Sequence, residues 1–455
     1  MNNRIYTILI ALSVLVGCST DEDIISVEQF TNELSEAERI NQWIYSQMNH
    51  YYLWREDMPD SIECDFNLTP KEFYESLLSS KDRFSYMDFN SSSSLSQNKD
   101  ADFGFFYQKY KAKNEEELLY VLLVTSEEVQ KAGIRRGDLL KKHIDKSNMF
   151  TFKKVSLSEN GSIQEHEILS YLSSVSRAAK NKTVYKDSIY RFSEHKIGYM
   201  CYLQYDSPAD FHETINRFYN EGISDLILDL RYNPGGLVST CEKLCNIVVD
   251  ASGYNNIFQQ CSYNNIVSAE NLEKYGNERT FTYFNPPNAY SGAILGLKYP
   301  YLQLPRIYVL TSQHTASASE ATINSLKPYM DVVVIGEQTT GKGVGMFTLS
   351  SPEYKYALVP ITFRYYNALG ETVPDEGLVP DYYVPDGYST LKREIGDIEE
   401  PLLRQALTLI CPNIFDYMPM GRASHIEQEN NYLTPVGEPS YITEFKQKQY
   451  LYENN

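Results

Sequence analysis

The feature that most constrains the fold is an alternation of apolar strands and helices after about residue 183. The expected strands are KIGYMCYLQY, SDLILDLRYN, RIYVLTS and DVVVIGE, and the expected helices are SPADFHETINRFYN, LVSTCEKLCNIVV and ASASEATINSLKPYM. Such alternation is typical of helices packed around a largely parallel sheet. A further helix is expected from Asp397 to Ile410. The sequence therefore predicts an α/β core.

Two smaller domains are predicted before this core. Residues 34–95 carry a helical, aromatic pattern, and residues 101–182 consist mainly of short β-type runs. The core itself is expected over residues 183–412, followed by a polar tail over residues 413–455. The expected fold class is thus multidomain α/β, with a helical N-terminal domain and a β-rich domain.

Length and charge narrow the classes of function. A chain of 455 residues is too long for one ordinary core, and 42% hydrophobic with 22% charged residues is typical of a globular protein. The formal net charge of -19, with no basic stripe to offset it, argues against a nucleic-acid partner, because phosphates require a basic face.

The N-terminus predicts export and a lipid anchor. Arg4 precedes an apolar stretch, Ile5 to Val16, that is too short to span a bilayer comfortably. The stretch ends in Leu-Val-Gly-Cys18, which resembles the bacterial lipoprotein box, in which the cysteine becomes the lipidated N-terminus.

This resemblance implies a signal peptide over residues 1–17, an anchor at Cys18 and an acidic tether over residues 18–33. It also implies a cell-envelope lipoprotein, most simply of the outer membrane, on its periplasmic or surface face. The alternative is an ordinary cleaved signal with an incidental cysteine.

The other cysteines predict neither a disulfide framework nor a metal site. They are Cys64, Cys201, Cys241, Cys245, Cys261 and Cys411. None has framework spacing, and the pair four residues apart lacks histidines at zinc spacing. We expect Cys241 and Cys245 to be buried as small apolar residues, and we predict no metal and no cofactor.

Residues 101–182 contain two turns with a possible binding role. Phe103-Gly104-Phe105, and later the turn from Gly133 to Asp138, resemble the binding loop and the G-x-x-x-G-D turn of PDZ domains. Such domains bind an extended peptide as an added strand and hold its terminal carboxylate with backbone amides. The resemblance implies a PDZ-like, peptide-binding domain; the alternative is a β-rich domain with a simple Gly-Asp turn.

The stretch GEQTTGKG, from Gly336 to Gly343, has the glycine and lysine spacing of a phosphate-binding loop. However, Gly343 stands where that loop needs Ser or Thr, and the following VGMFTLS has β-type residues instead of a helical pattern. Two of the three physical requirements for a nucleotide site fail. Lys342 therefore needs another role.

Ser317 lies where the strand RIYVLTS leads into a helix, and with Glu320 it forms an S-x-x-E capping pattern that requires no catalysis. If the strands that contain Ile307 and Val332 are parallel neighbours, the Ser317 and Lys342 loops meet at the carboxyl edge of the sheet. Lysine can then act as a general base for serine. For that role its ordinary pKa of about 10.4 must fall to about 7–8.

Three motifs, in the right order along the chain, resemble the C-terminal processing peptidases, also called tail-specific proteases. In chain order they are Leu-Asp-Leu-Arg-Tyr-Asn-Pro-Gly235-Gly236, Thr-Ala-Ser317-Ala-Ser-Glu, and Gly-Glu with Gly-Lys342-Gly; a later Gly-Leu-Val-Pro-Asp381 agrees with them. The serine and the lysine are 25 residues apart, as the family is expected to have them. The resemblance covers nearly the whole chain after Cys18.

The resemblance implies a crotonase-like α/β core and assigns roles to its residues. Ser317, rather than Ser312 or Ser319, would be the nucleophile, and Lys342 the base. The amides of Gly236, with its neighbour Gly235, and of Ala318 would form the oxyanion hole. The implied activity is that of a serine endopeptidase that hydrolyses unfolded or C-terminally tagged proteins, with polypeptide C-termini as partners.

One position departs from the family pattern. The family often has a glutamine four residues after the lysine, and here that residue is Met346, whose thioether cannot donate a hydrogen bond. The alternative function is therefore a catalytically weak or inactive peptide-binding lipoprotein. His314 suggests a Ser-His mechanism, but the sequence offers it no partner acid.

Overall fold

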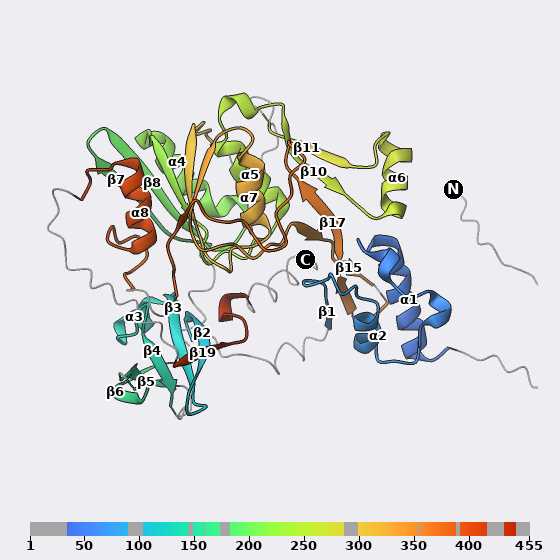
Figure 1. The fold of residues 1–455 in the computed structure, drawn as a ribbon, viewed down its shortest axis with the longest axis horizontal. Helices are drawn as coiled ribbons and strands as arrows, with labels where there is room; N and C mark the ends of the chain where they lie inside the picture. Colours follow the sequence, from blue (N-terminus) through green and yellow to red (C-terminus); the bar gives the residue numbers. More distant parts are fainter. Residues whose placement is uncertain are drawn as a thin grey trace, which may run out of the picture.

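The α/β part of the chain forms one six-stranded sheet, with a small β-rich body and a helical body packed beside it (Figure 1). The computed structural model describes residues 34–89, 103–143, 149–158, 160–172, 183–285, 299–351, 353–354, 356–387, 392–415 and 432–442. The predicted signal peptide, Cys18 and the acidic tether lie outside the described residues. Within the described ranges, no helix has both the length and the apolar character needed to cross a membrane.

The sheet of the core has the strand order β18-β13-β12-β9-β8-β7. Its strands are β7 (Val184–Phe192), β8 (His195–Tyr202), β9 (Asp225–Asp229), β12 (Arg306–Thr311), β13 (Asp331–Gly336) and β18 (Tyr382–Tyr383). β7 and β8 form an antiparallel hairpin, and all other neighbours are parallel. The prediction of a largely parallel sheet is confirmed, with an antiparallel strand at one edge.

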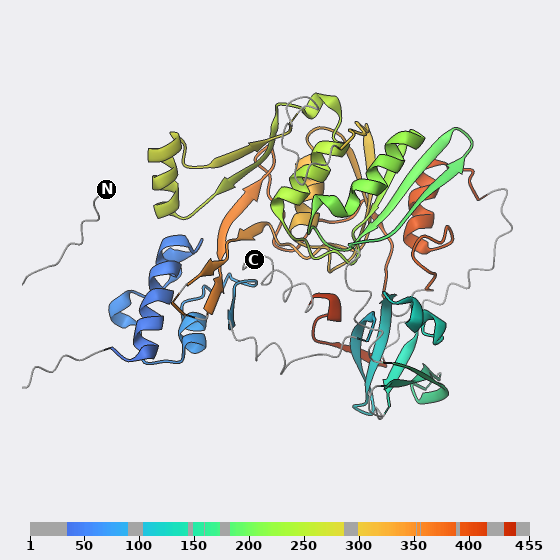
Figure 2. The same ribbon diagram turned by 180° about the vertical axis from the view of Figure 1, so that it is seen from behind.

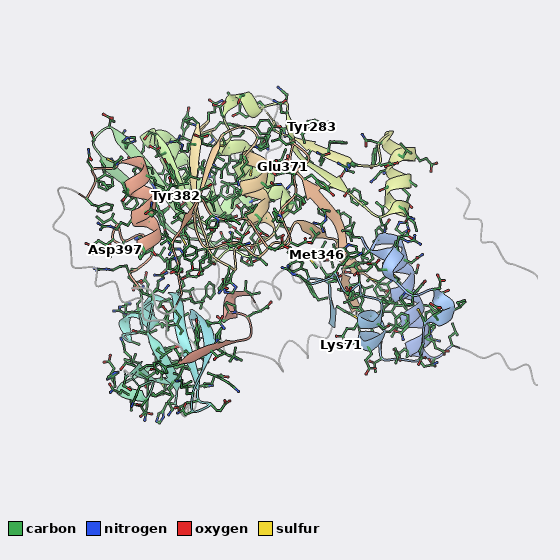
Figure 3. The ribbon with its side chains drawn as sticks, viewed as in Figure 1. Lys71, Tyr283, Met346, Glu371, Tyr382 and Asp397 are labelled. Carbon is green, nitrogen blue, oxygen red and sulfur yellow. The ribbon has the colours of Figure 1, made fainter. Side chains whose placement is uncertain are left out.

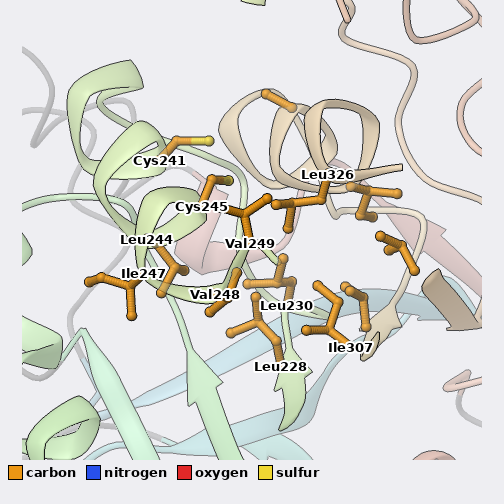
Figure 4. Packing of buried hydrophobic residues seen from close by; sticks show 14 of the residues in the cluster. Leu228, Leu230, Cys241, Leu244, Cys245, Ile247, Val248, Val249, Ile307 and Leu326 are labelled. Carbon is orange, nitrogen blue, oxygen red and sulfur yellow. The ribbon is translucent and has the colours of Figure 1, made fainter. Parts of the chain in front are cut away.

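Helices cover both faces of this sheet, because successive side chains of a strand point to opposite faces. The elements involved are η5 (Pro208–Phe211), α4 (His212–Glu221), α5 (Val238–Val248), η6 (Ala251–Gly253), α7 (Ala318–Leu326) and α8 (Pro401–Ile410). α4, α5 and α7 pack on one face, and Figure 4 shows Val248, Leu326 and Leu228 gathered in this layer. α8 and the β-rich body pack on the other face.

α8 begins at Pro401, four residues later than the expected start at Asp397. A residue that precedes proline is disfavoured in the α conformation, so the helix cannot easily extend through Glu400. Glu400 caps the helix instead, since its carboxylate accepts the amide of Leu403 at 3.0 Å.

The β-rich body is an antiparallel sheet with the order β19-β2-β3-β4-β5-β6. Its elements are β2 (Phe105–Ala112), β3 (Glu117–Val124), α3 (Glu127–Lys131), β4 (Leu139–Lys142), β5 (Met149–Leu157), β6 (Ile163–Leu172) and β19 (Leu433–Val436). The prediction of a polar tail over residues 413–455 is therefore wrong for β19. β2 would otherwise be an edge strand with unpaired backbone groups, and β19 pairs with them.

The N-terminal body is built on α1 (Glu36–Tyr51) and α2 (Pro70–Ser76), with 3-10 turns at Arg55–Asp57 and Ser61–Glu63. A capping box opens each helix, at Ser35 and at Thr69. The chain then forms β1 (Tyr86–Phe89), which pairs with β16 (Tyr356–Val359), and β16 pairs in turn with β15 (Leu349–Ser350). Leu358 of β16 is fully buried in the hydrophobic cluster of the helical body, so this small sheet is packed against α1 and α2.

A four-stranded sheet with the order β11-β10-β17-β14 extends from the core toward the helical body (Figure 2). Its elements are β10 (Ile257–Ser262), α6 (Asn265–Tyr275), β11 (Thr280–Tyr283), β14 (Val344–Met346) and β17 (Ile361–Tyr366). Asn264, at the start of α6, donates from its side chain to the carbonyl oxygens of His50 at 2.8 Å and Tyr52 at 2.9 Å. These bonds fix the extended sheet against α1.

A buried ion network joins the core, α8 and the β-rich body. Arg231 is fully buried, and it pairs with Glu400 (Nη1 to Oε1, 2.6 Å) and Asp229 (Nη2 to Oδ2, 2.9 Å). Arg136 of the β-rich body pairs with Asp386 of the core (Nη2 to Oδ1, 2.8 Å). Burial alone would raise the pKa of Asp386, but the neighbouring positive charges hold it well below its usual range.

Replacing Arg231 with methionine is expected to destabilise the protein by about 3–5 kcal/mol, because two carboxylates then lie buried without their partner. The midpoint of urea unfolding measures this loss. Arg306→Ala is the matched control, since it removes an exposed pair with Asp331 that contributes about 0–1 kcal/mol. If the two variants unfolded at the same urea concentration, the claim that the buried ion network stabilises the folded state would be contradicted.

Candidate active site

Ser317 lies at the sharp turn between β12 and α7. It is the residue just before the helix, with φ 55° and ψ -116°, and so has one of the positive φ angles that non-glycine residues rarely adopt. A residue held in this conformation costs free energy and persists only where its surroundings fix it. The turn presents Ser317 at the carboxyl edge of the parallel sheet.

Lys342 lies in the loop between β13 and β14, beside this turn. β12 and β13 are parallel neighbours, with Thr311 opposite Gly336, so the loops that follow them start from the same edge. The amide of Thr340 donates to Thr315 O at 3.0 Å and ties the two loops together. Gly341 (φ 83°) allows this path, because a Cβ there would lie 2.1 Å from the backbone oxygen of Asp375.

The carboxylate of Glu320 connects the backbones at Ser317 and Lys342. Its Oε2 accepts the amide of Ser317 at 2.9 Å and the amide of Lys342 at 2.8 Å. Its Oε1 accepts the amide of Gly341 at 2.7 Å and the hydroxyl of Thr339 at 2.5 Å. Burial raises the pKa of Glu320, and the four donors oppose that rise. Glu320 is therefore more than the helix cap that its sequence pattern indicates.

Tyr365 of β17 makes a second connection between the same two residues. Its one hydroxyl proton is shared between the carbonyl oxygens of Lys342, at 3.1 Å, and Ser317, at 3.3 Å. The ring is buried. Glu320 and Tyr365 thus hold Ser317 and Lys342 through their amides and their carbonyls respectively. We call these two residues the clamp.

The side chain of Lys342 reaches toward the N-terminal body. Its Nζ donates to Met346 Sδ at 3.3 Å and lies 5.4 Å from the centre of the Phe84 ring. Figure 3 labels Met346 at the junction of the core and the N-terminal helices. Arg83 fixes this neighbour, because its guanidinium donates to the carbonyl oxygens of Thr340 at 2.8 Å and Asp375 at 2.6 Å. The thioether is thus one acceptor for the lysine amine.

The glycine turn predicted for the oxyanion hole lies against Ser317. A Cβ on Gly235 would be 2.8 Å from Ser317 Cβ and 2.9 Å from the amide nitrogen of Ala318. The amide of Gly235 donates to Asn233 Oδ1 at 2.9 Å. In the described part of the chain, no backbone acceptor pairs with the amide of Gly236 or that of Ala318. These two amides remain suited to receive an oxyanion.

Lys342 lines a pocket of about 260 Å³ whose walls come from several parts of the chain. Its walls include Phe84 from the N-terminal body, Pro234 and His314 from the core, and Ile442 near the C-terminus. Within the described residues, no group of three or more His, Cys, Asp or Glu side chains is placed to hold a metal ion. The arrangement has the parts needed for serine chemistry with a lysine base.

The predicted peptide-binding residues Phe103, Gly104 and Phe105 do not line this pocket. The two phenylalanine rings are buried in the core of the β-rich body, where they stack with centroids 5.6 Å apart. Gly104 has φ 75°, and its carbonyl accepts the amides of Thr125 and Ser126. The predicted anchor Cys18 lies outside the described residues.

Three contributors to the site were not predicted from the sequence: Tyr365, Phe84 and the segment that contains Ile442. None belongs to a local motif, and each reaches the site from a distant part of the chain. The second role of Glu320 had a visible signal, its position three residues after Ser317. Cys241 and Cys245 are buried and free, as expected.

Two models of one family match the chain. The model described as Peptidase family S41 matches residues 196–384, which include Ser317 and Lys342, and the Peptidase S41 N-terminal domain matches residues 39–86. The protein named "Probable CtpA-like serine protease" in Staphylococcus aureus is 22% identical over 365 residues, which cover 74% of this chain and 64% of that protein. The protein of the same name in Staphylococcus epidermidis is 22% identical over 361 residues, with the same coverage. The chain therefore spans less than two thirds of the length of these relatives.

A solved structure shares the fold. The crystal structure of the "Putative S41 protease from Bacteroides fragilis" is similar with a TM-score of 0.64 and 24% identity, over 81% of this chain and 96% of that one. At this identity the likeness concerns the fold alone. That fold combines mixed α/β sheets with an N-terminal domain.

His314 is expected to titrate far below the usual range for histidine. Burial lowers its pKa from 6.5 to about 4, and the nearby Glu438 only partly opposes this. Because the folded state binds the proton more weakly than the unfolded state, His314 favours folding fully above about pH 6.5, and this contribution is lost as the pH falls toward 4. NMR titration of the ring, assigned with a His314→Gln variant, should give a midpoint near 4; a midpoint near 6.5 would contradict the burial.

Proposed function

Because this chain belongs to peptidase family S41, we propose that it is a serine endopeptidase in which Ser317 is the nucleophile and Lys342 the general base. The observation that carries this proposal is the shared Glu320 Oε2, which accepts the amides of both residues at 2.9 and 2.8 Å. One carboxylate oxygen cannot accept both amides unless the two loops are in contact.

The reaction follows from these positions. The neutral amine of Lys342 takes the proton of the Ser317 hydroxyl as the oxygen attacks the scissile carbonyl carbon. The amides of Gly236 and Ala318 stabilise the negative charge that develops on the carbonyl oxygen. The lysine then protonates the leaving amine, and water hydrolyses the acyl-enzyme. Gly235 is the weaker candidate for the oxyanion hole, because its amide already donates to Asn233.

The role of general base requires a neutral Lys342 amine at the moment of proton transfer. Its Nζ donates to Met346 Sδ, a poor acceptor, at 3.3 Å and lies 5.4 Å from the centre of the Phe84 ring. Phe84, which belongs to the N-terminal body, also forms part of the wall of the pocket that Lys342 lines. The N-terminal body therefore takes part in the catalytic site, besides its packing on β16.

The substrates we propose are unfolded or C-terminally tagged polypeptides. The sheet formed by β2 to β6 supports a PDZ-like role, because β2 already pairs with one added strand, β19, in the way that an extended peptide would pair with it. The parallel sheet covered by α4, α5 and α7 agrees with a crotonase-like core. The lipoprotein box at Cys18 supports attachment to a bacterial envelope membrane, most simply the outer membrane.

One observation favours a second function, that of a catalytically weak, peptide-binding lipoprotein. Met346 occupies the position at which the family often has glutamine, and the thioether holds the amine less firmly than an amide would. In this alternative the β-rich body still binds peptides, while the wild-type protein cleaves an unfolded test protein no faster than its Ser317→Ala variant.

Replacing Ser317 or Lys342 with alanine is expected to reduce cleavage of an unfolded test protein by about a thousandfold or more. Each variant removes one group that takes part in the proton transfer. The assay follows intact substrate by mass spectrometry, and circular dichroism establishes that each variant is folded. Lys327→Ala, which removes an exposed lysine at the end of α7, should cleave like the wild type. Substantial cleavage by either dyad variant would reject the assignment.

A further inference from the structure

The C-terminal segment, residues 432–442, follows a continuous path from the β-rich body to the catalytic pocket. β19 pairs antiparallel with β2, with Leu433 opposite Ala112 and Val436 opposite Lys109. Figures 1 and 2 show β19 lying along β2, followed by a short red turn between the β-rich body and the core. Without β19, this part of β2 would be the free edge of the sheet.

Side-chain and backbone donors of β2 extend the pairing beyond the strand. Gln108 Nε2 donates to the carbonyl oxygens of Val436 at 3.2 Å and Gly437 at 3.1 Å. The amide of Tyr107 donates to Ser440 Oγ at 3.0 Å. β2 therefore binds the segment mainly through the backbone of the segment, which is how a strand edge binds any extended peptide.

Past β19, Tyr441 anchors the segment on the core. Its side chain is only 3% exposed, and it packs against the rings of Phe106, Tyr232 and His314, with centroids 5.5 to 6.0 Å apart. Tyr232 and His314 belong to the loops that lead to Gly235 and Ser317. The anchor thus contacts both loops that lead to the proposed catalytic residues.

The segment also forms part of the pocket that contains Lys342. Glu438 and Ile442 line this pocket together with Ala316 and Lys342. A polypeptide that bound along β2 and continued to Ser317 would need the space that residues 437–442 fill. The segment and a substrate therefore compete for one path.

Two features make this contact suitable for displacement. β19 has only four residues, so few backbone bonds hold it. The hydroxyl of Tyr441 is buried, and among the described residues it has no hydrogen-bond partner, which costs free energy in the docked state. A substrate that pairs with β2 over a longer stretch, and whose side chain at this position carries no unpaired polar group, can replace the segment.

We propose that residues 432–442 are a built-in pseudosubstrate that occupies the peptide path of the protease and restrains it. The inference rests on the proposed function, and it deepens that function by naming the substrate class. Substrates are extended polypeptides that add antiparallel to β2 and place an apolar or aromatic side chain in the site of Tyr441. Displacement of the segment by substrate relieves the restraint.

The test measures peptide binding in a Ser317→Ala background, so that cleavage plays no part. A fluorescent peptide with the sequence of residues 432–442, YLTPVGEPSYI, is titrated into the full chain and into a variant that lacks residues 432–455. The peptide should bind the shortened chain at least tenfold more tightly. In the full chain the segment occupies the site in most molecules, and the apparent affinity for the peptide falls in proportion to the fraction of molecules whose site is free. Equal affinity for the two proteins, or no binding to either, would overturn the proposal.

Point variants of the full chain repeat the test in case the shortened chain folds poorly. Tyr441→Ala should tighten peptide binding as the deletion does, whereas Thr434→Ala, which changes an exposed side chain of β19, should leave the affinity unchanged. A Tyr441→Ala variant that loses thermal stability without gaining affinity would show that the segment is purely structural, and would also overturn the proposal.

The same variants with Ser317 restored separate this inference from the proposed function. Tyr441→Ala should lower KM for an unfolded substrate by at least tenfold and leave kcat nearly unchanged, because it frees the path without altering the dyad. If the Tyr441→Ala variant cleaves the substrate with an unchanged KM, the pseudosubstrate proposal is rejected and the peptidase assignment is retained. If the peptide binds the shortened chain and the Tyr441→Ala variant more tightly but no form of the protein cleaves, the segment does occupy a peptide-binding path. The peptidase assignment is then rejected.

Discussion

The site depends above all on one buried carboxylate. Glu320 accepts four hydrogen bonds, from the amides of Ser317, Gly341 and Lys342 and from the hydroxyl of Thr339. A charge taken out of water is costly unless donors surround it, and here the donors come from both loops that must meet. The requirement to satisfy this carboxylate therefore also brings the serine and the lysine together. Tyr365 completes the clamp from the opposite side, through the carbonyl oxygens.

The rest of the fold supplies the elements that this clamp joins. The parallel register of β12 and β13 brings the two loops to one edge, and Gly341 lets the second loop pass close to the neighbouring backbone. Phe84 and the C-terminal segment then close the pocket from two sides. A single α/β core would leave the lysine more exposed to water. The helical body and the segment at 432–442 are therefore parts of the site as well as of the fold.

The sequence allowed much of this architecture to be predicted. The buried runs around Ile307 and Val332 identify central strands, and the residues between them have helical spacing, so a parallel pair with adjacent loops follows from local pattern. Ser317 and Lys342 could be placed for the same reason. The start of α8 was missed, because the effect of proline on Glu400 outweighs the acidic, helix-favouring residues that precede it.

Contacts between distant segments could not be predicted in this way. Tyr365 lies in an ordinary β-type run, and nothing in its neighbours distinguishes it from the other tyrosines. β19 contains Thr and Pro with few apolar residues, so its local pattern indicates a loop; it becomes a strand only because β2 offers an unpaired edge. The preference for Gly236 over Gly235 likewise depends on a side-chain bond from Asn233 that spacing does not reveal.

The most direct test of the central claim is the rate at which a fluorophosphonate probe labels Ser317, followed by mass spectrometry of the intact protein and its peptides. The wild-type protein should acquire one adduct, at Ser317. Glu320→Gln, which replaces one accepting oxygen with a donor, should slow labelling by at least about tenfold, since 1.4 kcal/mol of lost positioning is a factor of ten. Labelling at another residue, or an undiminished rate in Glu320→Gln, would contradict the claim that this carboxylate assembles the site.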